Sequence, residues 1–279
     1  MTQVFDLHCH SNRSDGILSP EQLVSRAKAQ QVSCLALTDH DSVAGIAAAR
    51  LQAEQEGIRL VAGIEFSSQW AGRGIHVVGL NINPEAESIV AAVAAQEKVR
   101  AQRAETIAAR LARAGVDNAL PGALARAGGG TIGRPHFAQY LVDEGHVTTI
   151  NQAFKRYLGA GKPGDVKNLW PELETVVRWI VDAGGIAVLA HPAKYKLTRT
   201  KLCALASDFA SVGGRAMELV SGKQPVGLAE NLAKIASSYQ LAGSCGSDFH
   251  VPGQPWQELG CFSSLPVGAL PVWELWQTR

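Results

Sequence analysis

The sequence is poor in several features that would each point to a class of protein. Only five of its 279 residues are cysteine, without a CxxC pair, which argues against a disulfide framework and predicts a reducing, cytoplasmic location. No apolar run approaches the roughly 20 residues of a membrane span, and no signal segment is expected at the amino terminus. The formal net charge is only +1, so bulk attraction to nucleic acid or membranes is not expected. Affinity for an anionic substrate would have to come from local clusters of cationic side chains.

What the chain does contain is a regular alternation of predicted strands and helices. Hydrophobic residues make up 46% of it, enough for a large core. Short apolar stretches alternate with helical patterns, and the predicted strands are residues 4–10, 33–38, 59–66, 74–81, 186–190, 215–220 and 241–246. This rhythm is typical of an α/β protein with a parallel barrel or a doubly wound sheet.

The alternation stops after the fourth predicted strand. Residues 86–114 have the pattern of one long helix, and Gly128-Gly129-Gly130 and further helical patterns follow up to about residue 158. Because this stretch shows no convincing strand, we interpret residues 86–164 as a helical insertion, or lid. The barrel domain would then consist of residues 1–85 and 165–279.

The first predicted strand ends in two histidines. His8 and His10 are two residues apart, and side chains of a strand repeat their direction every two residues, so both should point to the same face. Two imidazoles side by side form half of a metal site. Cys9 lies between them on the opposite face and is expected in the core.

Further potential metal ligands occur in or just after other predicted strands. In a parallel barrel the carboxyl ends of the strands meet at one face, so these side chains should converge there. The full set is His8, His10, Asp15, His40, Glu65, His76, His191, Asp248 and His250. Imidazole and carboxylate ligands suit Mn²⁺, Fe²⁺ or Zn²⁺, of which we expect Mn²⁺, and their number predicts two or three ions.

Each of these residues, taken alone, has an ordinary structural explanation. Asp15 could belong to a turn, His76 could be a hydrogen-bonded core histidine, and His191 could simply end a strand. Their joint occurrence at strand ends favours the metal site. Asp6 and Asp39 are expected instead to accept hydrogen bonds that orient ligating histidines.

The motifs run along nearly the whole chain, from residue 8 to residue 250. They are His8-Cys9-His10, Ser14-Asp15-Gly16, Thr38-Asp39-His40, Gly63-Ile64-Glu65, Ile75-His76, His191-Pro192 and Gly246-Ser247-Asp248-Phe249-His250. In this order they resemble the motifs of the PHP (polymerase and histidinol phosphatase) superfamily. The resemblance implies a distorted (β/α)₇ barrel with a helical insertion and a centre of three metal ions.

The resemblance also implies a division of the ligands. His8, His10, Glu65 and Asp248 would hold the first ion; Glu65 would bridge to a second ion held by His76 and His191; and Asp15, His40 and His250 would hold the third. Glu65, Asp248 and His191 are the expected catalytic residues.

A closer resemblance is to stand-alone PHP phosphoesterases that carry a helical insertion and an Arg-Pro-His motif, which here is Arg134-Pro135-His136. Such proteins remove the 3′-phosphate of nucleoside 3′,5′-bisphosphates such as pAp, and some trim short RNA from its 5′ end. The resemblance therefore implies metal-assisted phosphomonoester hydrolysis, with a small nucleotide as substrate and short 5′-phosphorylated RNA as a second one. Membranes and duplex DNA are not expected as partners.

Several cationic side chains are expected near this site. They are Arg134, His136, Arg13, Lys162 and Lys194. A guanidinium group matches phosphate oxygens bidentately, so Arg134 is the expected clamp for the phosphate that does not react. Arg13 would either contact phosphate or face solvent. The arginines of the long helix, among them Arg100 and Arg103, are expected on a solvated face.

Other functions remain open from the residues alone. A histidinol-phosphate phosphatase would use the same centre on a smaller, amine-bearing substrate. A C–N hydrolase of the amidohydrolase type could use the same ligands, because an activated water attacks carbon as well as phosphorus. A non-catalytic nucleotide-binding module would lack some of the ligands, and none is missing. The phosphate-matched Arg134 favours the phosphoesterase.

Overall fold

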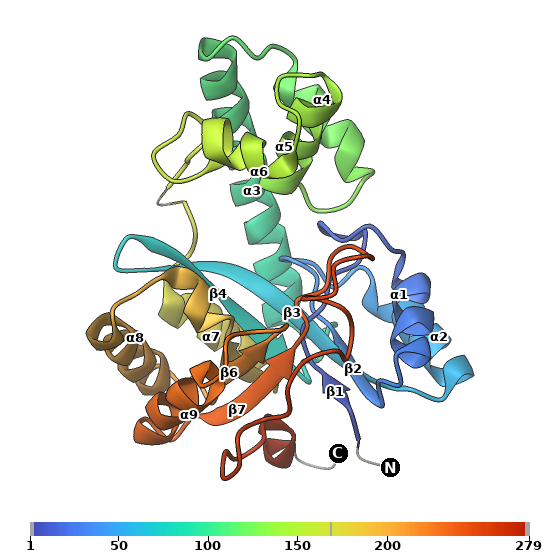
Figure 1. The fold of residues 1–279 in the computed structure, drawn as a ribbon, viewed down its shortest axis with the longest axis vertical. Coiled ribbons are helices and arrows are strands. Elements are labelled where there is room, and N and C mark those ends of the chain that lie inside the picture. Colours follow the sequence, from blue (N-terminus) through green and yellow to red (C-terminus); the bar gives the residue numbers. More distant parts are fainter. Residues whose placement is uncertain (1–2, 168, 277–279) are drawn as a thin grey trace.

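Seven strands form one sheet in chain order in the computed structural model, which describes residues 3–167 and 169–276 (Figure 1). The strands are β1 (Phe5–Asp6), β2 (Cys34–Leu37), β3 (Arg59–Trp70), β4 (Arg73–Leu80), β5 (Ile186–Leu189), β6 (Ala216–Ser221) and β7 (Ala242–Gly246). The first and last strands are also joined, since the Leu7 amide donates to the Cys245 carbonyl at 3.0 Å and the Asp248 amide to the His8 carbonyl at 2.8 Å. The sheet therefore closes into a barrel, as the predicted distorted (β/α)₇ fold requires.

Helices flank the barrel on two sides (Figure 1). On one side lie α1 (Pro20–Ala29) and α2 (Ile46–Glu56), and on the other α7 (Leu173–Asp182), α8 (Arg199–Ser211) and α9 (Leu228–Ser238). The start of α1 and the end of α2 lie at residues that favour helix termini. The Ser19 hydroxyl accepts a hydrogen bond from the Gln22 amide at 3.3 Å, which caps α1, and Gly57, with φ of 65°, ends α2.

One strand runs against the others, which corrects the expectation of an all-parallel sheet. β4 is antiparallel to both β3 and β5. Only Ala71 and Gly72 separate β3 from β4, and a two-residue turn can join only antiparallel strands. His76 pairs with Ser67 across this hairpin, near the carboxyl-terminal half of β3. The reversal therefore still places His76 at the same rim as the residues that follow the parallel strands.

A helical insertion between β4 and β5 rises from the barrel (Figure 1). It consists of α3 (Glu87–Arg113), α4 (Ala119–Ala127), α5 (Arg134–Asp143), α6 (Ile150–Ala153) and a π-helix, η1 (Phe154–Leu158). Near its start, α3 packs Ile89 into the barrel core, whereas further along Ile107 packs into a separate core with Phe137 and Leu141. This one long helix therefore connects the two apolar cores.

Short 3-10 helices complete the described structure. They are η2 (Pro192–Tyr195), directly after β5, and η3 (Val272–Leu275), near the carboxyl terminus. Trp273 of η3 stacks on Phe5 with ring centroids 4.0 Å apart, which places the tail against the start of β1. Within the described residues, no helix combines the length and apolar character needed to cross a bilayer.

Candidate metal centre

The nine potential ligands lie together at one rim of the barrel. They come from β3 and β4 and from the segments that follow β1, β2, β5 and β7: His8, His10, Asp15, His40, Glu65, His76, His191, Asp248 and His250. His8 and His10 do point to the same face, since their Nε2 atoms are 3.1 Å apart. Cys9, between them, is fully buried in the core.

Glu65 occupies the middle of this cluster. Only 1% of it is exposed. Its Oε2 atom lies 3.3 Å from Nε2 of His8, 3.3 Å from Nε2 of His10 and 2.9 Å from Nδ1 of His40. Its Oε1 atom lies 3.0 Å from Nδ1 of His76 and 2.9 Å from Nε2 of His191. One carboxylate thus faces imidazoles on both of its oxygens, which is the arrangement that a bridging ligand needs.

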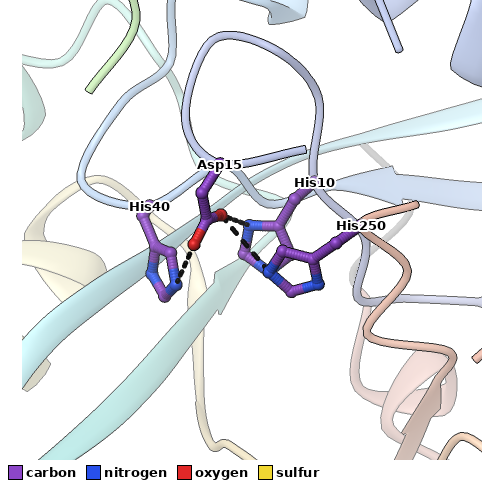
Figure 2. A group of neighbouring side chains, drawn as sticks. All are labelled: His10, Asp15, His40 and His250. Atoms are coloured by element: carbon purple, nitrogen blue, oxygen red, sulfur yellow. Dashed lines mark ion pairs between the residues drawn. The ribbon is translucent and has the colours of Figure 1, made fainter. Parts of the chain in front are cut away.

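Asp15 organises a second group of side chains, which Figure 2 shows. Its Oδ1 atom lies 3.3 Å from Nε2 of His250 and 3.7 Å from Nδ1 of His10, and its Oδ2 atom lies 3.7 Å from Nε2 of His40. Asp248 completes the cluster on the side of the first strand, with Oδ1 3.6 Å from Nε2 of His8. Three overlapping groups in the cluster have ligand atoms within 4.8 Å of one another: His10, Asp15, His40 and His250; His8, His10 and Glu65; and His40, Glu65 and His76.

These side chains fit divalent metal ions. Two imidazole nitrogens 3.1 Å apart can share at most one proton, so the His8–His10 pair needs a cation if both are to present lone pairs. Burial and the neighbouring His250 lower the pKa of His10 to about 3, which keeps that imidazole in the neutral form that binds metal. Burial raises the pKa of Glu65, but His40, His8 and His76 more than offset it and hold that pKa well below its ordinary value.

The structure adds Glu218, which the sequence analysis missed. Glu218 lies on β6, is 1% exposed, and places Oε1 2.6 Å from Nδ1 of His8, while its Oε2 accepts a hydrogen bond from the His191 amide at 2.6 Å. A carboxylate at Nδ1 fixes the ring so that Nε2 faces the cluster. The available signal was a lone acidic residue in an otherwise apolar strand.

The expectation that Asp6 and Asp39 orient histidine rings was wrong. The Asp39 carboxylate accepts hydrogen bonds from the Ser11 amide and the Ser14 hydroxyl, each at 2.7 Å. Asp6 accepts from the amide of Ser247 at 2.8 Å. Both carboxylates therefore fix the loops that carry the ligands rather than the rings themselves.

A cavity of about 160 Å³ opens beside the histidines, beneath the insertion. Its lining includes Asp15, His40 and His76 together with three arginines, Arg100, Arg103 and Arg134. Burial and the nearby Arg134 guanidinium lower the pKa of Arg103 to about 9, so Arg103 is still charged at neutral pH. The cavity therefore offers a concentrated positive charge next to the candidate metal ligands.

Arg103 differs from its neighbours in its hydrogen bonding. The residue is 7% exposed, and within residues 3–167 and 169–276 its Nε has no hydrogen-bond partner. Its guanidinium lies 5.2 Å from the ring centroid of Trp170. Arg134 is better supported, with Nη1 3.4 Å from the Leu158 carbonyl oxygen and its guanidinium 5.9 Å from the Phe154 ring. A buried guanidinium nitrogen without a hydrogen-bond partner among the described residues is costly, so this cavity is suited to an anion.

Arg100 has a different role. Its Nε donates to Oδ2 of Asp41 at 2.6 Å, Nη2 to the Ser67 hydroxyl at 3.0 Å, and Nη1 to the Ile132 carbonyl at 3.0 Å. It therefore ties α3 to the loop after His40 and to the segment before α5. The expectation of a solvated face was wrong for Arg100 and Arg103, because the barrel and the insertion enclose that face of α3.

The other residues that were predicted to contact the substrate lie in different parts of the structure. Nδ1 of His136 accepts a hydrogen bond from the Gly133 amide at 3.0 Å and so caps α5. Lys194 forms an ion pair with Asp248, one of the potential metal ligands. Arg13 is exposed. Lys162 is also exposed and lines a separate hollow on the insertion with Lys155.

Comparisons with known proteins agree with this architecture. A family model described as "PHP domain" matches residues 6–159. A 5′-3′ exoribonuclease of Haemophilus influenzae is 46% identical over 274 residues, covering 98% of this chain and 99% of that protein. A 3′,5′-nucleoside bisphosphate phosphatase of Chromobacterium violaceum is 39% identical over 275 residues, covering 98% and 96%.

A solved structure shares the whole fold. It is described as an amidohydrolase from Chromobacterium violaceum with bound sulfate and no metal, and it matches with a TM-score of 0.91 at 39% identity, covering 97% of this chain and 95% of that one. The family model spans more than half of the chain, and the relatives are similar over nearly its full length. The chain therefore belongs to the PHP domain family.

Proposed function

We propose that this protein is a metal-dependent phosphoesterase that removes the 3′-phosphate of nucleoside 3′,5′-bisphosphates such as pAp, and that it also trims short RNA from a 5′-phosphorylated end. The observation that carries the proposal is the cavity in which Arg103 and Arg134 lie beside the candidate ligands His40 and His76. A substrate with two phosphates can place one at the ligand cluster and the other in this cavity. The names of the relatives from Haemophilus influenzae and Chromobacterium violaceum support both activities.

The metal content is part of the proposal. We assign three ions, with Mn²⁺ in preference to Fe²⁺ or Zn²⁺; a ligand set made only of imidazole and carboxylate is compatible with each of these metals. The first would be held by His8, His10, Glu65 and Asp248, the second by Glu65, His76 and His191, and the third by Asp15, His40 and His250. When bound, such ions activate a water molecule and neutralise charge on the phosphate oxygens.

Binding of the substrate and positioning of the ligands depend on other side chains of this protein. Arg134 and Arg103 bind the 5′-phosphate, with Arg134 able to make the bidentate contact that a phosphate accepts. Glu218 keeps the ring of His8 in position. We also assign contacts with the substrate's polar groups to Lys194, which is paired with Asp248, and to His136, which follows Arg134 on α5. The insertion of residues 86–164 acts as a lid over the barrel formed by residues 1–85 and 165–279, which excludes water from the arginine cavity.

One bond is broken in both substrates. A water oxygen bonds to phosphorus, the P–O3′ bond breaks, and the 3′-oxygen takes up a proton. In pAp this releases inorganic phosphate. In 5′-phosphorylated RNA it releases the first nucleotide as a 5′-monophosphate and leaves a new 5′-phosphate on the shortened chain. The net charge of +1 argues against long duplex DNA, which usually needs an extended basic surface.

The alternative substrates fit the cavity less well. The amine of histidinol phosphate would carry positive charge toward Arg103 and Arg134, and like charges in a buried site repel. An uncharged amide, the substrate of a C–N hydrolase, would leave both guanidinium groups without an anion. Neither alternative explains why Arg103 and Arg134 should be enclosed next to the ligand cluster.

A substrate panel tests the proposal. Phosphate release by Mn²⁺-loaded protein should be faster from pAp than from a generic aryl phosphate or histidinol phosphate. The relevant quantity is kcat/KM, measured for each substrate under the same conditions. Faster turnover of histidinol phosphate, with pAp no better than the aryl phosphate, would refute the assignment.

A further inference from the structure

We propose that the rim formed by the segments after β6 and β7 is a binding site for the part of a single-stranded RNA that lies 3′ of the cleaved bond, with Trp256 as a stacking platform and Lys223 as a phosphate contact. The inference rests on the proposed function and extends it. The two proposed substrates differ only in one substituent of the reacting phosphate, which is a free oxygen in pAp and the next nucleoside in RNA. Efficient RNA cleavage therefore needs a surface for that nucleoside.

The position of the arginine cavity indicates where such a surface must lie. The cavity adjoins His40 and His76 and is covered by the insertion. Asp248 lies on a different side of the cluster, paired with His8 and His10. In the proposed arrangement, a chain whose 5′-phosphate is enclosed in the cavity continues from the ligand cluster on the side of Asp248, away from the cavity.

A continuous set of contacts leads outward from Asp248. Nε2 of Gln257 donates to the Asp248 carbonyl oxygen at 2.8 Å. The next residue toward the amino terminus, Trp256, is 54% exposed, which is unusual for so large an apolar side chain. The Lys223 amide donates to the Trp256 carbonyl oxygen at 2.7 Å, which joins the segment after β6 to the segment after β7. Trp256 and Lys223 are therefore neighbours just beyond the ligand cluster.

The surroundings of Lys223 suit a nucleotide. Lys223 is exposed and lines two hollows, of about 530 and 350 Å³. The larger also contains Phe262, and the smaller contains Glu258. The carboxylate of Glu258 is paired with Arg26 at 2.6 Å, so it does not oppose an approaching phosphate.

This combination of residues matches the way in which proteins bind single strands. Exposed aromatic rings stack on bases of any sequence, and lysines beside them contact the phosphates. In the proposed arrangement the base of the second nucleotide stacks on Trp256. The phosphodiester between the second and third nucleotides then reaches Lys223.

Substrates of increasing length test the Trp256 and Lys223 contacts separately. With pAp, pApA and pApApA as substrates of the Mn²⁺-loaded protein, Trp256→Ala should lower kcat/KM roughly tenfold on pApA and pApApA and leave pAp within about twofold. Trp256→Phe should retain most of the wild-type rate, because it keeps a stacking surface. Lys223→Ala should slow only pApApA, and its effect should shrink as salt is raised.

Matched controls lie at the opposite end of the barrel. Val267→Ala and Lys234→Ala change an exposed apolar and an exposed cationic residue beside the start of β7, and neither should alter any of the three rates. An equal loss on pAp in Trp256→Ala would show that the residue only supports Gln257 and Asp248, and would overturn the inference. So would unchanged cleavage of pApA and pApApA. Failure of the wild-type protein to hydrolyse pAp would instead count against the proposed function.

Discussion

Glu218 and His8 are 210 residues apart in sequence, yet Oε1 of Glu218 lies 2.6 Å from Nδ1 of His8 in the interior of the barrel. The second oxygen of the same carboxylate binds the His191 backbone amide. One residue thus positions potential ligands of two different ions. Removal of the Glu218 carboxylate should therefore lower both the affinity for metal and the activity.

Glu218→Gln keeps the size of the side chain but removes its charge. We expect the affinity for Mn²⁺ and the rate on pAp each to fall about 10- to 100-fold, the range typical of residues that orient metal-bound histidines. Metal titration of the purified variant, together with steady-state kinetics, measures both. Glu230→Gln, an exposed position on α9, is the matched control. Unchanged Mn²⁺ affinity in Glu218→Gln would show that this carboxylate is not needed to orient His8.

The number of ions can be counted directly. Removing metal with a chelator should abolish hydrolysis of pAp, and adding Mn²⁺ back should restore it. Metal analysis of the saturated protein should approach three ions per chain. His8→Ala should lose far more activity than His146→Ala, because His146 contacts Tyr140 on the insertion, with ring centroids 6.4 Å apart, and lies outside the cluster. A single ion at saturation would contradict the trinuclear assignment.

Arg134→Ala and Arg103→Ala should each raise KM for pAp strongly. Each removes a charge-assisted contact worth roughly 1.5–3 kcal/mol, which corresponds to about a 10- to 150-fold change. Hydrolysis of a nucleoside 3′-monophosphate should change far less, because that substrate has no 5′-phosphate. Arg113→Ala, an exposed arginine of α3, is the control. Equal losses on both substrates would mean that these arginines touch the reacting phosphate or only support the fold.

Arg100 should matter for stability rather than for substrate choice. Its pair with Asp41 is almost completely buried, so Arg100→Ala leaves an uncompensated carboxylate and should lower the free energy of unfolding by about 3–5 kcal/mol. Urea denaturation of the single variants and of the double variant with Asp41→Ala measures the coupling. The double variant should be less destabilised than the sum of the two single ones. Strict additivity would show that the two side chains do not depend on each other.

The sequence by itself determined which potential metal ligands gather at one rim and the class of fold that carries them. The alternation of strands and helices predicted an α/β protein with a parallel barrel or a doubly wound sheet, and the resemblance to the PHP superfamily favoured the barrel. The long stretch without strands predicted the helical insertion, because these patterns are periodic and local. The convergence of residues such as His8, Glu65 and Asp248 also followed from the sequence. In a barrel, a position at a strand end already implies a position at one rim.

Only the tertiary structure decided how this cluster is supported and what lies next to it. The direction of β4 follows from a two-residue turn, and its pairing with β5 joins segments separated by the whole insertion. Glu218 had no local signal beyond its place in an apolar strand. Arg103 has the spacing of a surface residue on a helix. It becomes an enclosed charge only because α3 is packed against the barrel at one end and the insertion at the other. Such relationships depend on contacts between residues far apart in sequence, and no local pattern encodes them.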